Sequence, residues 1–337
     1  MRKIISSRAP VRICDIGGWT DTWFYPNGAV FSFCVDLYSN VTITPTKNNK
    51  IQIYSENLNL TTEIKDFLNI QYDGTLDLLK AAIKRMEINK GMNINVRAEA
   101  PPGCGTGTSA SVAVALIAAL CQFSDKKLDP YEIAELAHKL ETEELNLESG
   151  VQDQYAAAIG GINFMKITYP SVKITPIKIN KKRIYELENQ LILVFLNSRS
   201  SSVMHKAVIE NFKKGEQSTL ESFEIIRNCA EEMVKAIHSE DLTTMGEIMN
   251  KNWNALKNLH ALMVTPTIKK AERLAFNNGA IGFKLNGAGG GGSISILADT
   301  GKEYLLTQKL IENGFQILPV KLDFLGVQTW TSWDNSN

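Results

Sequence analysis

The sequence predicts an α+β fold built from two domains. Its 337 residues exceed the roughly 100–200 residues that one ordinary domain needs. Both halves mix helical and strand patterns, and the strands do not alternate regularly with helices, which argues against a βαβ architecture. We place a boundary near residues 170–190 and expect domains at residues 1–180 and 181–337.

The first hundred residues are rich in strand patterns. β-Branched and aromatic residues, or alternating polar and apolar ones, favour strands at residues 29–35, 40–44, 50–54 and 92–98. Apolar residues at helical spacing predict a helix over residues 75–88. Arg12 lies in a further predicted strand near the N-terminus.

Two helices follow a glycine-rich turn. From Thr108 onward, the sequence SASVAVALIAALCQF is apolar on most sides, which predicts a deeply buried helix. The next helix, over residues 131–145, begins after the start signal formed by Asp129 and Pro130.

The second half is dominated by long helices. Helical patterns occupy residues 203–214, 219–238, 242–259, 265–277 and 302–313. Strands are expected at residues 190–196, 282–285, 293–298 and 316–320. The basic run at residues 181–183 is interpreted as a solvated turn.

Composition excludes several classes of protein. The 36 Lys+Arg balance 36 Asp+Glu, so nothing favours a nucleic-acid partner. The apolar run at residues 110–121 is shorter than the ~20 residues that cross a bilayer, and the N-terminal segment has no secretory core. Five scattered cysteines without a CxxC pair indicate reduced thiols. We therefore expect a cytoplasmic protein without membrane partners.

A glycine-rich segment, PPGCGTGTSAS at residues 101–111, joins a predicted strand to the buried helix. Its glycines allow a ligand to approach the backbone, and the helix start offers unpaired N–H groups surrounded by hydroxyls. A plain turn with a Ser/Thr N-cap needs only one glycine and one hydroxyl, so the segment predicts a phosphate-binding loop. It has neither the lysine of a Walker loop nor the following strand of a Rossmann unit.

A second glycine run, GAGGGG at residues 287–292, matches GxGxxG as a string. Predicted strands flank it on both sides, whereas a dinucleotide motif requires a helix after the glycines. It is therefore interpreted as a loop that a ligand approaches closely, with a plain β-turn as the simpler alternative. A nicotinamide-dependent oxidoreductase using this run is the alternative function from another class.

Four charged residues are candidates for chemistry. Asp153 precedes an apolar, small-residue stretch, where a helix N-cap and a functional acid fit equally well. Glu141 belongs to an acidic helix face that is mostly solvated. Arg12 and Asp21 bracket the sequence GGWT, which suggests a polar cleft or an ion pair with a turn. The four histidines lie in predicted helices without ligand spacing, so we expect no zinc site.

Three motifs in this order resemble the GHMP kinase superfamily, named for galactokinase, homoserine kinase, mevalonate kinase and phosphomevalonate kinase. They lie at residues 9–21, 101–111 and 284–292. GVQDQYA at residues 150–156 and NSRSS at 197–201 are similar to the sugar-kinase branch that contains D-glycero-D-manno-heptose kinases. The sequence GGWTDT also resembles fucokinase-like and glucuronokinase-like enzymes. The resemblance implies a ribosomal-protein-S5-like N-terminal domain and a ferredoxin-like α+β C-terminal domain.

The resemblance also implies an ATP:sugar phosphotransferase that uses Mg²⁺ and moves the γ-phosphoryl group to a hydroxyl of a heptose phosphate or a related hexose or uronic acid. Asp153 would be the base or orienting carboxylate, Arg12 would stabilise the transferred charge, and Ser109 and Glu141 would reach the metal. The nucleotide would be bound by Pro102, Gly103, Cys104, Gly105, Thr106, Gly107, Thr108, Ser109 and Ala110. The acceptor would be bound by Gly18, Asp21, Gly287, Ala288, Gly289 and Gly290.

Other assignments stay open beside this one. Within the same fold, a mevalonate-pathway kinase is the alternative, although the segments containing Asp21 and Asp153 make it the less favoured one. A non-catalytic nucleotide- or sugar-binding module is a third class, which the full set of charged residues disfavours. The expected partner is a small sugar or sugar phosphate, and a homodimer is compatible with the sequence.

Overall fold

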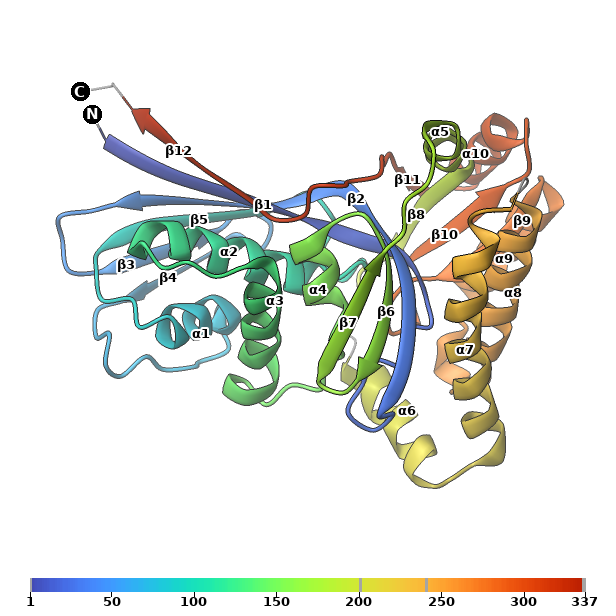
Figure 1. The fold of residues 1–337 in the computed structure, drawn as a ribbon, viewed down its shortest axis with the longest axis horizontal. Helices are drawn as coiled ribbons and strands as arrows, with labels where there is room; N and C mark the ends of the chain where they lie inside the picture. The colour runs from blue at the N-terminus through green and yellow to red at the C-terminus, as the bar shows by residue number, and fades with distance from the viewer. Residues whose placement is uncertain (1, 200–201, 240–241, 335–337) are drawn as a thin grey trace.

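A large, mostly antiparallel sheet forms one half of the molecule (Figure 1). This computed structural model describes residues 2–199, 202–239 and 242–334. The path of the sheet is β12-β1-β2-β5-β3-β4, with β6 paired to β2 and β7 paired to β6. Only β3 and β5 run parallel within the described ladder. Its strands are β1 (Arg2–Ile16), β2 (Asn27–Pro45), β3 (Ile51–Ser55), β4 (Leu60–Ile64), β5 (Met92–Ala98), β6 (Ile162–Thr168), β7 (Ser171–Pro176) and β12 (Gln328–Asp334).

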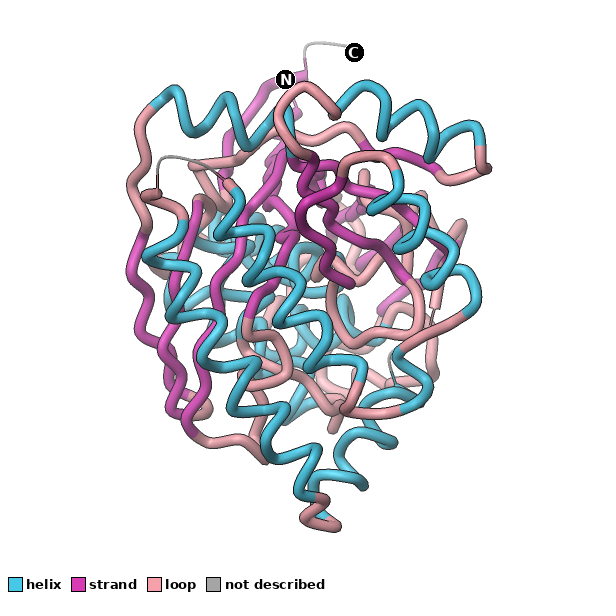
Figure 2. Tube along the Cα trace, turned by 90° about the vertical axis from the view of Figure 1, so that its right-hand side faces the viewer, coloured by secondary structure: helices cyan, strands magenta, loops and turns pink. Residues whose placement is uncertain are grey.

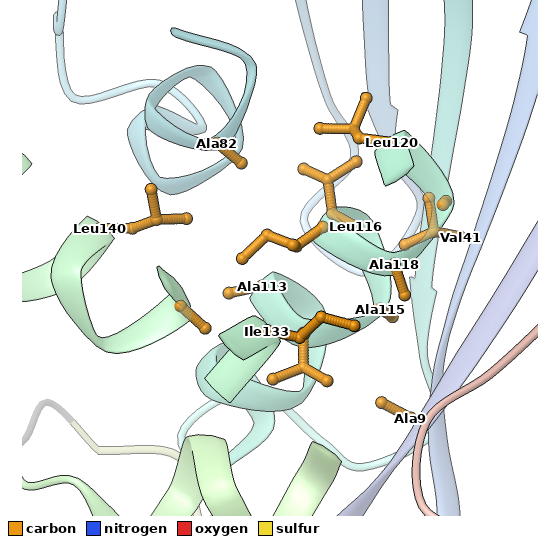
Figure 3. Packing of buried hydrophobic residues seen from close by; sticks show 14 of the residues in the cluster. Ala9, Val41, Ala82, Ala113, Ala115, Leu116, Ala118, Leu120, Ile133 and Leu140 are labelled. Carbon is orange, nitrogen blue, oxygen red and sulfur yellow. The ribbon is translucent and has the colours of Figure 1, made fainter. Parts of the chain in front are cut away.

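Four helices pack together beside this sheet. They are α1 (Asp77–Arg85), α2 (Thr108–Ser124), α3 (Pro130–Lys139) and α4 (Gln152–Ile159). The apolar helix α2 lies on β1 and β2, with the other three around it. Figure 3 shows Leu116 and Leu120 of α2 among Ala82, Ile133 and Leu140, all of which are buried in one cluster. Burial on nearly every side explains why α2 lacks a polar face.

A second, smaller antiparallel sheet has the order β11-β8-β10-β9. Its strands are β8 (Leu191–Asn197), β9 (Ala280–Leu285), β10 (Gly292–Ala298) and β11 (Gln316–Leu318). Long helices run across this side of the molecule (Figure 2). The helices are α5 (Lys181–Gln190), α6 (Ser202–Lys213), α7 (Gln217–Ala236), α8 (Thr243–Lys257), α9 (Pro266–Asn277) and α10 (Glu303–Glu312). In the described part of the chain, none of the helices is long and apolar enough to cross a membrane.

The two sheets are joined by packing and by a buried polar contact. Helix α7 packs on α8 and also contacts β1, β2 and β6 of the first sheet. The backbone N–H of Cys14, in β1, donates a hydrogen bond of 2.9 Å to the side-chain oxygen of Asn286 after β9. Asn286 is fully buried and also receives a 3.0 Å hydrogen bond from Ser295. This contact brings the first and third sequence motifs together.

The α+β class is confirmed, and three local predictions need correction. The helix expected over residues 131–145 divides into α3 and a π-helix, Leu140–Glu144. Residues 181–183 begin α5 rather than a turn, because the Asn180 side chain caps the helix by accepting from the Arg183 N–H at 2.8 Å. The strands expected at 29–35 and 40–44 are parts of one strand, β2.

The C-terminal strand makes a connection that the sequence did not indicate. Strand β12 returns to the first sheet and pairs antiparallel with β1, with Lys3 opposite Trp333. The last described segment of the expected C-terminal domain therefore contributes to the sheet of the N-terminal one. The boundary near residue 180 stays a prediction.

Candidate active site

The three sequence motifs meet around one cavity of about 560 Å³. Most of the residues predicted to bind substrates or metal line it. These are Arg12, Asp21, Gly103, Cys104, Gly105, Gly107, Thr108, Ser109, Ala110, Glu141, Asp153, Gly287 and Ala288. Five other predicted site residues do not line the cavity: Gly18, Pro102, Thr106, Gly289 and Gly290.

Close packing against methionines explains why two of these residues, Gly289 and Gly290, lie outside the cavity. A Cβ on Gly289 would lie 2.1 Å from the sulfur of Met263, and a Cβ on Gly290 would lie 3.0 Å from the Cε of Met204. These two glycines therefore allow the loop to pack against methionines. Only Gly287 and Ala288 of this run face the cavity.

The start of α2 opens into the cavity. Gly107 is its N-cap residue, with φ of 75°, and no side chain caps the helix. The first backbone N–H groups of a helix have no partner within the helix, and the dipole makes this end positive. Gly103 and Gly105 also have positive φ, of 72° and 79°. The segment therefore has the geometry of an anion-binding loop.

Arg12 and Asp153 form an ion pair beside this loop. The Arg12 Nε donates to Oδ1 of Asp153 at 2.8 Å, and Nη1 donates to the carbonyl oxygen of Gly105 at 2.5 Å. Burial alone would lower the pKa of Arg12, but the carboxylates of Asp15 and Asp153 raise it above its ordinary value. Asp153 lies in the first turn of α4 and is partly exposed to the cavity. The pair thus joins the first motif, the glycine-rich loop at residues 103–110 and α4.

A second, buried ion pair, between Lys284 and Asp15, lies next to Arg12. Lys284 Nζ lies 3.0 Å from Oδ1 of Asp15, and each side chain is only 1% exposed. Asp15 Oδ2 is 3.7 Å from Arg12, and the Gly287 N–H donates to the same carboxylate at 3.2 Å. Burial raises the pKa of Asp15, but Arg12 and Lys284 lower it more, so the net pKa is depressed. The sequence did not indicate this pairing, because the partners lie in distant motifs.

Glu141 reaches the cavity from the π-helix. It is buried, and its Oε2 accepts hydrogen bonds from Ser149 at 2.5 Å and Gln154 at 2.7 Å. Burial raises its pKa, the nearby charge of Asp153 adds to this, and the Ser109 hydroxyl opposes it. Glu141 and Ser109 therefore place a carboxylate and a hydroxyl together beside the phosphate loop.

Asp21 has a structural partner as well as a place in the cavity. Its Oδ2 accepts a 3.1 Å hydrogen bond from the backbone N–H of Gln152, at the start of α4. A Cβ on Gly150 would lie 2.1 Å from this oxygen, so a larger residue there would displace the carboxylate. Burial, together with the charge of Asp153, raises the pKa of Asp21 to about 6.

Several further cavity residues were not predicted as site residues, among them an arginine, a histidine and a tryptophan. Arg199 follows β8, His205 lies in α6, and Trp19 belongs to the first motif. The ring centroids of Trp19 and His205 are 5.2 Å apart, in an edge-to-face arrangement. His205 is one of the four histidines that lie in predicted helices without ligand spacing, so the sequence did not point to it as a site residue. Ser200 and Ser201, of the motif NSRSS, lie outside the described residues.

Comparisons with known proteins place similar sequences over nearly the whole chain. Residues 75–161 match the family model "GHMP kinases N terminal domain", and residues 233–315 match "GHMP kinases C terminal". D-glycero-alpha-D-manno-heptose 7-phosphate kinase of Campylobacter jejuni is 30% identical over 97% of this chain and 99% of its own. A galactokinase of Thermotoga neapolitana is 27% identical over 87% of this chain and 89% of its own.

Solved structures share the whole fold. A D-glycero-D-manno-heptose 1-phosphate kinase from Bacteroides thetaiotaomicron aligns with a TM-score of 0.81 and 24% identity, over 98% of this chain and 100% of its own. Mevalonate kinase of Methanococcus jannaschii aligns with a TM-score of 0.75 and 25% identity, over 95% of this chain and 98% of its own.

Proposed function

The chain belongs to the GHMP kinase family, and from this we propose that it transfers the γ-phosphoryl group of ATP to a hydroxyl of a heptose phosphate. The relative from Campylobacter jejuni, which matches over nearly its full length, carries that acceptor in its name. The observation that carries the proposal is the contact between the phosphate loop and the Arg12–Asp153 pair. A Cβ on Gly107 would lie 3.0 Å from the Cγ of Asp153.

The phosphate loop would hold the nucleotide. The amides from Gly103 to Ala110 and the free end of α2 supply fixed donors for phosphate oxygens. Phosphoryl transfer depends mainly on alignment and on neutralisation of negative charge, so a rigid loop suits the reaction. The residues of this segment that line the cavity, from Gly103 to Ala110 except Thr106, would contact the nucleotide.

Asp153 would receive the proton of the attacking hydroxyl. The acceptor oxygen forms a bond to the γ-phosphorus, the bond to the bridging oxygen breaks, and its electron pair leaves with ADP. The hydroxyl proton passes to the Asp153 carboxylate as the new bond forms. The Nε hydrogen bond from Arg12 holds that carboxylate in place.

Ser109 and Glu141 fit a magnesium ion. Mg²⁺ prefers oxygen ligands and often binds through one or two carboxylates together with substrate phosphates. Glu141 is a buried carboxylate near the charge of Asp153, and the nearby cavity holds the Ser109 hydroxyl, so a cation would relieve the repulsion. When bound, Mg²⁺ would neutralise charge on the nucleotide phosphates.

Alternative functions have weaker support. The glycine run at 287–292 lies between strands β9 and β10, without the helix that a nicotinamide-binding motif requires. Mevalonate kinase shares the fold, with 25% identity for the Methanococcus jannaschii structure. The heptose phosphate kinase relative is more similar, at 30% identity over 97% of this chain. A cytoplasmic location and a homodimer stay expectations from the sequence.

The test is an assay of ADP release with purified protein, ATP and Mg²⁺. D-glycero-D-manno-heptose 7-phosphate should give the highest kcat/KM in a panel that also contains galactose, fucose, glucuronate and mevalonate. NMR of the product would then identify the hydroxyl that was phosphorylated. Turnover of mevalonate alone, or NAD(H) binding without ATP binding, would overturn the proposal.

A further inference from the structure

The ion pairs around Arg12 and Asp153 contain as many negative as positive charges. Arg12 and Lys284 contribute two positive charges, and Asp15 and Asp153 contribute two negative charges, through the described ion pairs. A cation already paired with two carboxylates has less net attraction for a phosphate. The balanced group therefore leaves the charge of a transferred phosphoryl group to be met from elsewhere in the cavity.

Arg199 is a cavity cation whose charge is not balanced in this way. Among the residues that the structure describes, no carboxylate forms an ion pair with it, whereas Arg12 pairs with both Asp15 and Asp153. Its Nε donates to the carbonyl oxygen of Gly291 at 3.3 Å. Burial, together with the positive charge of Arg12, lowers the pKa of Arg199 to about 10, so it is still charged at neutral pH.

The position of Arg199 is set by both glycine loops. Its Nη2 would lie 3.3 Å from a Cβ on Gly105 and 3.2 Å from a Cβ on Gly287. Its backbone nitrogen would lie 2.7 Å from a Cβ on Gly103. The guanidinium group therefore occupies space that side chains at Gly105 and Gly287 would crowd. This places it next to the loop that would hold the nucleotide phosphates.

We propose that Arg199 is a further catalytic residue, which binds the γ-phosphoryl group of ATP while that group is transferred. The inference rests on the proposed function, because it takes the loop at 103–110 as the nucleotide site. Guanidinium N–H groups would donate to the non-bridging oxygens of the γ-phosphate. The acceptor oxygen bonds to the γ-phosphorus while the bond to the bridging oxygen breaks. The hydroxyl proton passes to Asp153, and the electron pair leaves with ADP.

Nucleotide affinity provides the direct test. We would measure dissociation constants of ADP and of the non-hydrolysable analogue AMPPNP for wild type, R199Q and R199K, with Mg²⁺ and without acceptor. R199Q should weaken AMPPNP binding about tenfold or more and change ADP binding less than about twofold, because only AMPPNP carries the third phosphate. R199K should recover part of the loss. R97Q removes an exposed arginine on β5 and is the matched control.

Turnover provides the second arm. In R199Q, kcat should fall by about 10³-fold, as for other arginines that stabilise a transferring phosphoryl group. An equal loss of ADP and AMPPNP affinity would show that Arg199 only supports the loop, and would overturn the inference. R199Q could instead lose only the preference of the enzyme for phosphorylated over unphosphorylated sugar. That result would show that Arg199 binds the phosphate of the acceptor, and it would overturn the inference as well.

The two proposals can fail separately. Nucleotide binding is measured without any sugar, so it stays informative if no heptose phosphate is turned over. Thermal unfolding of each variant shows whether it is folded, and R199K keeps the charge if R199Q does not fold. Retention of wild-type AMPPNP affinity in both variants would exclude contact with the γ-phosphate.

Discussion

Gly107 and Asp153 are in direct contact, and a methyl group added to Gly107 would lie 3.0 Å from the Cγ of Asp153. Gly107 is the N-cap of α2, and Asp153 is in the first turn of α4. The N-terminus of α2 therefore packs directly against the carboxylate that would receive the proton. A phosphate bound at the end of α2 would lie beside that carboxylate.

We expect G107A to reduce activity far more than stability. Gly107 has φ of 75°, which costs alanine about 1 kcal/mol, and the new methyl group would press on Asp153. A misplaced catalytic carboxylate should lower kcat by about 10²-fold. The matched control is G301A, because Gly301 has φ of 80° and no atom within 4 Å of its Cβ position. Equal kcat values for the two variants would contradict the contact between Gly107 and the catalytic carboxylate.

We expect D153N to bind nucleotide normally and to turn over slowly. Asparagine keeps the shape of the side chain and can still accept from the Arg12 Nε, but it cannot take up the hydroxyl proton. We expect kcat to fall by about 10²–10⁴-fold, the range typical of general-base removal, while the AMPPNP dissociation constant changes little. Single-turnover kinetics and calorimetric titration would measure the two quantities. Unchanged turnover would remove Asp153 from the mechanism.

The buried pair of Lys284 and Asp15 should contribute strongly to stability. K284M leaves the buried Asp15 carboxylate with Arg12, at 3.7 Å, as its remaining ion-pair partner, and breaking a buried pair typically costs about 3–5 kcal/mol. Urea unfolding at pH 7 would measure the loss in the free energy of unfolding. The double variant D15N/K284M should recover much of it, since no uncompensated charge remains. Additive losses in the double variant would show that the two residues act independently.

This pair also predicts a dependence on pH. The pKa of Asp15 is depressed in the folded protein, so its ionisation adds stability above the ordinary pKa of about 4, and this is lost as pH falls through the folded value. Wild type should therefore lose more stability than D15N/K284M between pH 7 and pH 3. Parallel pH profiles of the two proteins would contradict this assignment.

The elements that the sequence predicted well are those with strong local patterns. Helix α2 is apolar on nearly every side, and the glycines before it adopt positive φ, which other residues rarely do. The glycine-rich turn and the buried helix could therefore be predicted from residues 101–124 alone. The pairing of β12 with β1 could not be predicted from local patterns. Strand β12 is an edge strand with mostly exposed side chains, so its sequence lacks the apolar pattern of a buried strand.

The candidate site was predicted in part, for a similar reason. The residue types of Asp153 and Arg12 could be recognised, but only the fold brings Lys284 to Asp15 and Arg199 between the glycine loops. A π-helix depends on the packing of its surroundings, so the turn that carries Glu141 into the cavity has no clear sequence pattern. Charge pairing across distant segments is set by tertiary structure, which one sequence does not display.

Asp21 should make the folded protein less stable at neutral pH, so D21N should be more stable than wild type. Burial and the charge of Asp153 raise the pKa of Asp21 from 3.8 to about 6. The folded state then binds a proton more readily than the unfolded state, so stability falls as pH rises from about 4 to about 6. D21N keeps an oxygen that can accept from the Gln152 N–H, and it has no charge to bury.

The advantage of D21N should therefore be largest above pH 7, at most about 3 kcal/mol. It should shrink as pH falls from about 6 to about 4 and be absent below pH 4, where wild-type Asp21 is protonated in both states. Urea unfolding across this range would measure it, with D125N as the control for loss of an exposed carboxylate. Because Asp21 also lines the cavity, KM for the acceptor should rise although stability increases. A D21N protein that is less stable than wild type at pH 8 would show that the capping hydrogen bond needs the charge, and that burial is not its main cost.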